Sequence, residues 1–315
     1  IRRSHDLNIA AKRGWCFLIS AILLIPGIVF LIIAPGLNPG IDFTGGSTMT
    51  VKFADITDQQ SIRTSLESMD ISDATVQNFG ENTFFIRTKE LNETEKDDLL
   101  SYLESDLSPN GYDVLSFDIV SPLVAQETII AAFWALFAAA IGIFFYVWWA
   151  FRNIPKPFRY GAAAIIALLH DAGVIIGIFA ILGYVADVEV NTMFLIALLT
   201  VIGYSVNDTI VVFDRVRENI ISAPNRSLEA NVDLSIGETI GRSINTSLTL
   251  LLTLLALMLF GGPTLKSFLL VLIIGVLVGT YSSIAVATQI VVAWEKQDFP
   301  RMFSRITKRR LPASE

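Results

Sequence analysis

The sequence is poor in charge and in cysteine. Only 17% of its 315 residues are charged, whereas 53% are hydrophobic and the mean hydropathy is +0.58. A soluble globular protein of this length carries more charge, so the composition indicates an integral membrane protein. The single cysteine, Cys16, excludes an intramolecular disulfide, and its place in an apolar run indicates a small buried side chain.

Missing patterns exclude several classes of site. The two histidines, His5 and His170, are too few for a credible metal site. Ser205 and His170 would suit an intramembrane serine protease, but Ser205 lies in GYSVN rather than in the G-x-S-x-G nucleophile elbow. The glycine-rich GIDFTGGS at 40–47 has neither the spacing nor the lysine of a phosphate-binding loop. We therefore expect no enzyme, no metal and no cofactor.

Long apolar runs are abundant. A helix that crosses a bilayer needs about 20 predominantly apolar residues. We expect six such helices, at 15–34, 125–151, 159–183, 191–213, 243–260 and 265–293. The first run is longer than the apolar region of a signal peptide, and Ile33-Ala34-Pro35 is a poor cleavage site, so we interpret it as a retained anchor.

The basic residues are distributed unevenly between the segments that join these runs. If both termini are cytoplasmic, the inner segments hold 17 of the 23 lysines and arginines, whereas the short outer loop 184–190 holds none. The positive-inside rule therefore predicts a multi-pass protein of the cell membrane with cytoplasmic termini. The N-terminus with the first span would occupy 1–34, and a basic tail would occupy 294–315.

The only long polar segment, residues 35–124, lies between the first two spans and would be extracytoplasmic. Its order of elements, βαββαβ, is typical of a ferredoxin-like α+β domain. The remaining five spans would occupy 125–293. Alternating and helical patterns predict strands at 47–54, 74–79, 83–88 and 112–120 and helices at 58–69 and 93–107.

This predicted domain is acidic, with 16 Asp or Glu against 5 Lys or Arg. A solvated surface or an adaptation to salt explains such a balance, and a docking face for basic partners is the alternative. The motif that leads into the domain contains Gly40, Asp42, Gly45 and Gly46. Its glycines permit positive φ and close backbone approach, so we expect a defined link rather than a flexible one.

Three further patterns concern the helices. Gly173 and Gly177 in the third span, and Gly275 and Gly279 in the sixth, have the small-xxx-small spacing of close helix contacts. Residues 227–240 carry apolar side chains at Leu228, Val232 and Ile236 among acidic and polar ones, which predicts a short amphipathic helix along the inner membrane surface. Glu127 opens the second span near the outer interface, where a charge is tolerated.

Charged residues inside the apolar runs are the main candidates for function. Asp208 lies about 9 Å beyond the centre of the fourth run at about 1.5 Å per residue, where an ionised carboxylate costs about 2.5–3.5 kcal/mol. Tyr204 and Ser205 share its helix face, which should therefore meet protein or water. Asn207 and Thr209 flank it.

Arg242 begins the fifth span at a similar depth to Asp208. One interpretation is a static ion pair that ties two helices together. The other is a proton site in which the protonation of Asp208 depends on how close Arg242 lies. Asp171, near the middle of the third span, is the second candidate proton-handling group, and its neighbour His170 suits a hydrogen bond between helices.

Four motifs occur in a characteristic order along nearly the whole chain. They are GIDFTGGS after the first span, LLHDAGVIIG in the third, VNDTIVVFDRVREN at the end of the fourth and GRSINTSLT at the start of the fifth. Together they resemble the SecF members of the SecD/SecF family, which belongs to the resistance-nodulation-division superfamily.

The resemblance implies a protein-export role driven by the proton motive force. It implies SecD as the second half of a twelve-span unit, with the SecY-E-G translocon and a preprotein as further partners and no nucleic acid. It also implies that Asp208 carries protons and that Arg242 is its partner. The alternatives are half of a small-molecule or lipid exporter of the same superfamily and a passive assembly scaffold.

Overall fold

The computed structural model describes residues 8–33, 36–71, 73–262 and 265–296. The chain divides into two compact units. The first contains residues 1–36, 136–181 and 196–315, and the second contains residues 37–135 and 182–195. The predicted basic tail lies outside the described residues from position 297 onward.

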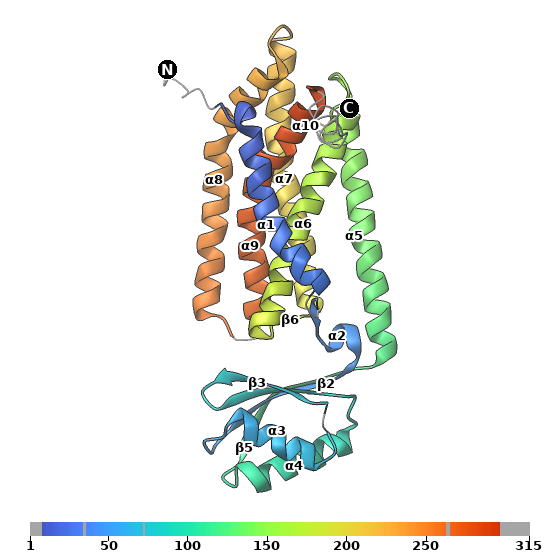
Figure 1. Ribbon diagram of the computed structural model, residues 1–315, viewed down its shortest axis with the longest axis vertical. Helices are drawn as coiled ribbons and strands as arrows, with labels where there is room; N and C mark the ends of the chain where they lie inside the picture. The colour runs from blue at the N-terminus through green and yellow to red at the C-terminus, as the bar shows by residue number, and fades with distance from the viewer. Residues whose placement is uncertain (1–7, 34–35, 72, 263–264, 297–315) are drawn as a thin grey trace, which may run out of the picture. The chain divides into compact units, whose positions relative to one another are not determined.

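The described residues contain six helices that are long and apolar enough to cross a membrane, as the sequence predicted (Figure 1). The sixth is continuous from Lys266 to Glu295 but changes its winding within the span, where a π-helical segment separates two α-helices. The elements are α1 (Arg13–Ile33), α5 (Pro122–Ala150), α6 (Phe158–Ala186), α7 (Thr192–Ser222), α8 (Leu228–Phe260), α9 (Lys266–Ser282), the π-helical segment Ser283–Ala287 and α10 (Thr288–Glu295).

The short surface helix predicted at 227–240 is wrong as a separate element. The segment is the first part of α8, which continues without a break into the fifth span. Its apolar side chains Val232 and Ile236 are buried in a cluster with Val216 and Phe213 of α7. Burial against a neighbouring helix, rather than against lipid, therefore satisfies the amphipathic pattern.

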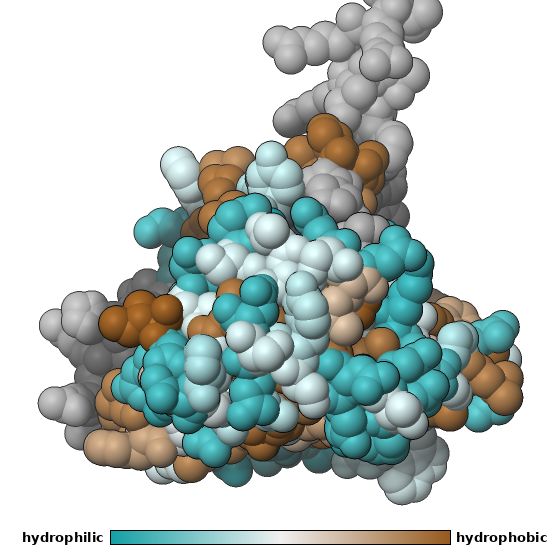
Figure 2. All heavy atoms as spheres, turned by 90° about the horizontal axis from the view of Figure 1, so that it is seen from below, coloured by the Kyte–Doolittle hydropathy of each residue, from teal (hydrophilic) through white to brown (hydrophobic). Residues whose placement is uncertain are grey.

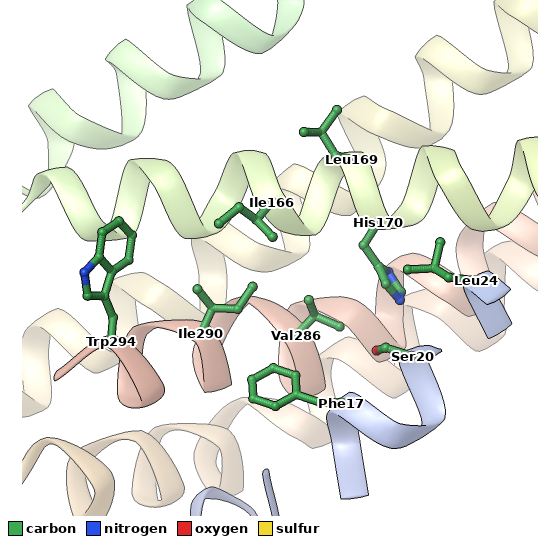
Figure 3. Close-up of a pocket in the computed structure, with 9 residues that line it drawn as sticks. All are labelled: Phe17, Ser20, Leu24, Ile166, Leu169, His170, Val286, Ile290 and Trp294. Atoms are coloured by element: carbon green, nitrogen blue, oxygen red, sulfur yellow. The ribbon is translucent and has the colours of Figure 1, made fainter. Parts of the chain in front are cut away.

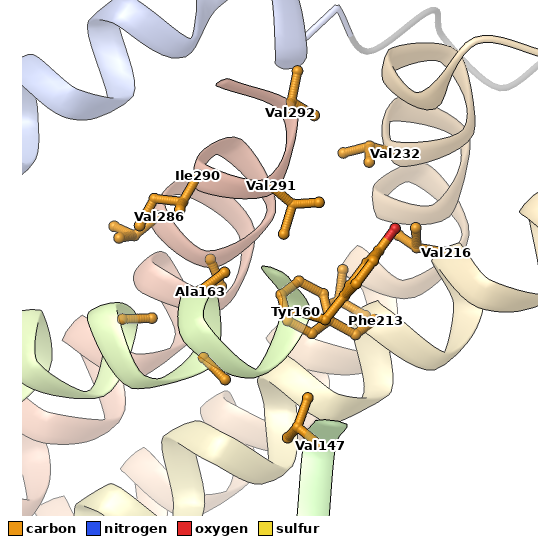
Figure 4. Close-up of a cluster of buried hydrophobic side chains, with 14 of the residues drawn as sticks. Val147, Tyr160, Ala163, Phe213, Val216, Val232, Val286, Ile290, Val291 and Val292 are labelled. Carbon is orange, nitrogen blue, oxygen red and sulfur yellow. The ribbon is translucent and has the colours of Figure 1, made fainter. Parts of the chain in front are cut away.

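Aromatic rings fix the end of α7 that follows Asp208 (Figure 4). Phe151 and Tyr160 stack with ring centroids 5.5 Å apart, and Phe213 meets Tyr160 edge-on at 5.4 Å. Such pairs add about 0.5–1.5 kcal/mol to the burial of the rings. The cluster therefore joins α5, α6 and α7 firmly.

The small-xxx-small pairs take part in close helix contacts. A Cβ on Gly177 would lie 2.7 Å from the Cα of Gly27, so α6 and α1 meet at backbone distance. A Cβ on Gly279 would lie 2.9 Å from that of Ser205, and Gly275 faces Val201 in the same way. The glycines of α9 therefore bring α7 close to the sixth span.

The second unit contains the predicted ferredoxin-like domain. Its strands form one antiparallel sheet in the order β3-β4-β2-β5, and Met49, Phe84 and Leu99 are among its buried core residues. None of its described acidic residues is buried, and the face shown in Figure 2 is largely hydrophilic. The elements are β2 (Gly46–Phe53), α3 (Gln59–Ser68), β3 (Thr75–Gly80), β4 (Thr83–Thr88), α4 (Glu93–Leu107) and β5 (Tyr112–Val120).

Capping residues explain where the two domain helices begin. The side chain of Asp58 accepts a hydrogen bond from the backbone N–H of Ser61 at 2.7 Å. Asn92 and Glu95 form a reciprocal capping box at the start of α4. Each cap satisfies backbone donors that a helix leaves unpaired, which is worth about 1 kcal/mol. Local sequence signals were therefore sufficient to position both helices.

The glycine-rich link is also well defined. A two-residue strand, β1 (Asn38–Pro39), pairs in parallel with β6 (Glu189–Val190), and the short helix α2 (Ile41–Thr44) follows it. Gly45 and Gly46 have φ of 73° and 127°, and a Cβ on Gly46 would lie 2.6 Å from the Thr88 carbonyl oxygen. Only glycine suits that position.

Hydrogen bonds from five residues close this link, and we call the group Gly40, Asp42, Arg87, Glu189 and Thr192 the latch. The Gly40 amide donates to the Val190 carbonyl at 2.7 Å, and Asp42 Oδ2 accepts from the Thr192 amide at 2.6 Å, at the start of α7. Arg87 donates to the Pro39 carbonyl at 2.8 Å and to Glu189 Oε1 at 3.1 Å. The link is thereby fixed to the 187–192 segment.

We expect Gly177→Val to lower the unfolding midpoint of the detergent-solubilised protein. The added methyl groups would meet the backbone of Gly27, and overpacking of this kind costs about 1–3 kcal/mol. Gly142→Val is the matched control, because a Cβ there has nothing within 4 Å. Equal thermal midpoints for the two variants would contradict the close contact between α1 and α6.

We expect Arg87→Gln to weaken the latch most at high pH. Burial raises the pKa of the Glu189 carboxyl above its ordinary value, and Arg87 counteracts that rise. A raised carboxyl pKa means that the folded latch binds the proton more tightly, so its stability falls as pH increases from the ordinary to the raised pKa. Removing Arg87 lets the pKa of Glu189 rise further, so the pH range over which the latch loses stability extends to higher pH.

Amide hydrogen exchange at Gly40 and Thr192, corrected for the intrinsic effect of pH, measures the opening of the latch. Exchange should accelerate in Arg87→Gln and accelerate further with rising pH across the window. Arg63→Gln removes an exposed arginine of the same domain and should leave both amides protected. Unchanged protection in Arg87→Gln would show that the arginine does not hold the latch.

Candidate functional site

Asp208 lies in α7, half-buried, at a point where three elements of the first unit meet. Its Oδ1 accepts a hydrogen bond from Ser243 Oγ of α8 at 2.6 Å, and its Oδ2 accepts one from Ser283 Oγ of the π-helical segment at 2.7 Å. Both carboxylate oxygens are therefore bound by neutral hydroxyl groups. Hydroxyls can donate to an ionised carboxylate or accept from a protonated one, so this environment suits either state.

Arg242 is not bonded to Asp208 in this structure. Within the described part of the chain Arg242 forms no ion pair with a carboxylate, and its side chain is exposed. It lines a cavity of about 340 Å³ together with Arg215 and Glu238, which are joined to each other at 2.7 Å. Asp208 thus contacts Ser243, the residue next to Arg242. The interaction between Asp208 and Arg242 itself stays a prediction.

Asp171 of α6 is the more deeply buried carboxylate, with no exposed surface. Its Oδ1 lies 2.9 Å from His170 Nδ1, and its Oδ2 accepts hydrogen bonds from Ser282 Oγ at 2.6 Å and from Ser205 Oγ. Ser205, expected beside Asp208 on one helix face, therefore binds the other carboxylate. Tyr204 instead reaches Ser247 of α8 at 2.9 Å.

Of the four serines that hold the carboxylates, only Ser205 is among the predicted site residues. Ser243 lies in the motif GRSINTSLT, whereas Ser282 and Ser283 belong to none of the four motifs. The available signal was a pair of adjacent serines in a largely apolar span. Hydroxyls inside a membrane helix usually bond to their own backbone, so that pair alone does not predict carboxylate partners.

The other predicted site residues do not join this cluster. In α7, Thr209 is buried and Asn207 is exposed, and Glu127 is exposed on α5. The motif residues belong to the second unit, where they form or adjoin the latch; they are Gly40, Asp42, Gly45 and Gly46. Among the described residues, no group of three His, Cys, Asp or Glu is placed to hold a metal ion.

The two carboxylates have similar surroundings. Both carboxylates lie in membrane-spanning helices with hydroxyl partners and without a bonded lysine or arginine among the described residues. Charge buried in this way is costly, and protonation removes that cost. The cluster offers no nucleophile aligned with a base, since the histidine contacts a carboxylate rather than a serine.

Two models of known protein families match this chain. Residues 103–297 match the family described as "Protein export membrane protein SecD/SecF, C-terminal", and residues 30–55 match the "SecD/SecF GG Motif". The second match covers the glycine-rich link and all of β2. The first covers the end of the ferredoxin-like domain and the spans that carry both carboxylates.

The chain is also similar in sequence to curated proteins over nearly its full length. It is 43% identical to the protein translocase subunit SecF of Thermobaculum terrenum, with 95% of this chain and 97% of the relative covered. It is 39% identical to the SecF subunit of Anaerolinea thermophila, with 98% of this chain and 99% of the relative covered.

A solved structure shows the same fold in a longer chain. The crystal structure of SecDF from Thermus thermophilus, a translocon-associated membrane protein, matches 90% of this chain at 32% identity with a TM-score of 0.79. The present chain spans only 38% of that one. On its sequence, its six membrane-spanning helices and its ferredoxin-like domain, this multi-pass membrane protein belongs to the SecD/SecF family of protein-export membrane proteins.

Proposed function

We propose that the chain is an auxiliary subunit of the Sec translocase that uses the proton motive force, together with SecD, to assist preprotein export. The single observation that carries this proposal is Asp208, a carboxylate within a membrane-spanning helix that is held by serines from two other elements. A hydroxyl-bound carboxylate can change its protonation without losing its partners. The site therefore suits a proton carrier better than a static tie.

The free energy released by proton movement is similar to the cost of an ionised carboxylate in the membrane. Moving one charge through a potential of about 150 mV releases about 3.5 kcal/mol. That is close to the cost of about 2.5–3.5 kcal/mol for an ionised carboxylate inside a membrane helix. Protonation and deprotonation of Asp208 can therefore shift α7 between two arrangements of similar free energy.

Arg242 is the proposed partner of Asp208 when Asp208 is deprotonated. It lies one residue before Ser243, which already contacts Asp208. Because its guanidinium is exposed and makes no ion pair within the described residues, it is available to approach an ionised Asp208. We infer that proton loss draws the arginine toward the carboxylate and that proton uptake releases it.

The family supports the partners that we propose. The Thermus SecDF chain contains a region beyond the part that this chain matches, and we propose that a separate SecD subunit supplies it here. Both termini would then lie in the cytoplasm. The ferredoxin-like domain would lie on the other side of the membrane, to which the SecY-E-G translocon delivers the preprotein. An exporter half and a passive scaffold are the alternatives that the experiments below distinguish.

We expect Asp208→Asn to abolish the stimulation of preprotein export by a proton gradient. Asparagine keeps the size of the side chain but cannot release a proton, so the cycle stops. The measurement is export into vesicles that contain SecD and SecY-E-G, with and without the gradient. Asp214→Asn, which changes a half-exposed carboxylate on the same helix, should retain the stimulation. Normal gradient-dependent export in Asp208→Asn would favour the scaffold.

We expect Arg242→Met to impair the same stimulation as severely as Asp208→Asn. Methionine keeps an unbranched side chain of similar length but removes the charge that would pair with the deprotonated carboxylate. Arg226→Met, an arginine near the start of α8, serves as the control. A fully active Arg242→Met variant would restrict Arg242 to a surface role. The proton-carrying role of Asp208 would then be decided by the Asp208→Asn experiment alone.

A further inference from the structure

The second carboxylate, Asp171, has a partner that Asp208 lacks. His170 Nδ1 lies 2.9 Å from Asp171 Oδ1, and when this carboxylate is ionised it only accepts hydrogen bonds, so that Nδ1 then carries the hydrogen. In the neutral imidazole the other nitrogen, Nε2, is then an acceptor. The dyad of His170 and Asp171 has a net charge of −1 in that state and becomes neutral when Nε2 binds a proton.

His170 Nε2 is a buried polar atom without a partner in the described structure. The side chain of His170 is only 5% exposed. It lines a cavity of about 640 Å³ between α1, α6 and the sixth span, where it lies beside Ser20 and Leu24 (Figure 3). An unpartnered buried nitrogen is costly unless something binds it, and a proton delivered through the cavity is the smallest candidate.

Few other groups can titrate around this dyad. The ring of Tyr281 has its centroid 6.3 Å from that of His170, and its hydroxyl donates to the carbonyl oxygen of Cys16. Phenol and thiol side chains are neutral at neutral pH. From α7 the dyad meets the hydroxyl of Ser205, with the carboxyl of Asp208 one turn further along that helix. No lysine or arginine ion pair reaches Asp171 among the described residues.

Two adjacent serines connect the dyad with Asp208. Ser282 Oγ lies 2.6 Å from Asp171 Oδ2, and Ser283 Oγ lies 2.7 Å from Asp208 Oδ2. They stand at the junction where α9 ends and the π-helical segment begins. Changes of helical winding of this kind occur frequently at functional sites. The two carboxylates are therefore held by consecutive residues of one backbone.

Each serine hydroxyl has one hydrogen and two acceptors within reach. Ser282 Oγ also lies 3.2 Å from the Gly279 carbonyl oxygen, and Ser283 Oγ lies 3.0 Å from that of Thr280. The hydrogen can point to the carboxylate or to its own helix. A carboxylate that gains or loses negative charge changes which acceptor is preferred. Because the serines are consecutive residues, a movement of this backbone segment would displace both hydroxyls relative to their carboxylates.

We propose that His170 and Asp171 form a second proton-binding centre, loaded at His170 Nε2 from the cavity and coupled to Asp208 through Ser282 and Ser283. A proton from water forms the Nε2–H bond, Nδ1 keeps its hydrogen bond to Asp171, and the dyad becomes neutral. Release returns the proton to water. The proposal rests on the proton-carrying role of Asp208, and it adds a second site whose occupancy that role depends on.

The small number of histidines makes a direct test possible. The chain contains two, so His5→Gln leaves His170 as the only imidazole. The protein labelled with ¹⁵N-histidine is reconstituted with SecD in lipid bilayers, and NMR follows both ring nitrogens with pH. We expect Nδ1 to stay protonated throughout and Nε2 to gain a proton as pH falls. An Nε2 signal that does not change between about pH 4 and pH 9 would overturn the proposal.

Variants of the same labelled protein test the coupling. Asp208→Asn removes a neighbouring negative charge, so the Nε2 midpoint should move to lower pH by about one unit, a tenfold loss of proton affinity. Ser282→Ala and Ser283→Ala should each reduce this response to Asp208→Asn. Ser247→Ala, which removes a buried hydroxyl that contacts Tyr204 and Thr280 but no carboxylate, should preserve it. An Nε2 midpoint that ignores Asp208→Asn would overturn the coupling.

This readout is independent of export. If Asp208→Asn leaves gradient-dependent export intact, the proposed function fails whatever the NMR signals show. If export is lost but Nε2 does not titrate, the second centre fails while the role of Asp208 stands. The two proposals therefore have separate tests.

Discussion

The structure depends on one constraint: a carboxylate inside a membrane must have every oxygen satisfied without water. Here hydroxyl groups meet that constraint at three of the four carboxylate oxygens, and His170 meets it at Asp171 Oδ1. Asp208 takes one hydroxyl from α8 and one from the π-helical segment, and Asp171 takes one from α7 and one from the end of α9. Each carboxylate thus joins its own helix to two others. The same hydrogen bonds therefore hold the spans together and satisfy the carboxylates.

Close helix contact makes that solution possible. A serine hydroxyl is short, and it reaches a carboxylate on another helix only when the two backbones nearly touch. Gly275 and Gly279 provide this proximity by placing α9 against Val201 and Ser205 of α7. Ser282 follows less than one turn after Gly279, so the residues that permit the approach and the residues that use it lie side by side in the sequence. Bulkier residues at the two glycines would separate the hydroxyls from their acceptors.

Much of this fold follows from the sequence, because its causes are local. Apolar length identified the six spans, alternation identified the strands of the ferredoxin-like domain, and Asn92 marked the start of α4. Counting along the apolar runs also placed Asp208 and Asp171 within membrane-spanning helices, as in the structure. Their partners did not follow from counting, because the choice of hydroxyl depends on how each helix is rotated about its axis. The same reason explains why Ser205 faces Asp171 and why 227–240 belongs to α8, since both depend on which neighbour covers a helix face.

The parallel pairing of β1 with β6 has a consequence for biosynthesis. Asn38 pairs with Glu189, so the two halves of this small ladder are separated by about 150 residues of chain. At about 5–20 residues per second a ribosome needs about 8–30 s to cover that distance. The strands β2 to β5 and both domain helices are complete long before β6 exists. The ferredoxin-like core can therefore form early, while the latch must wait until α6 has been made.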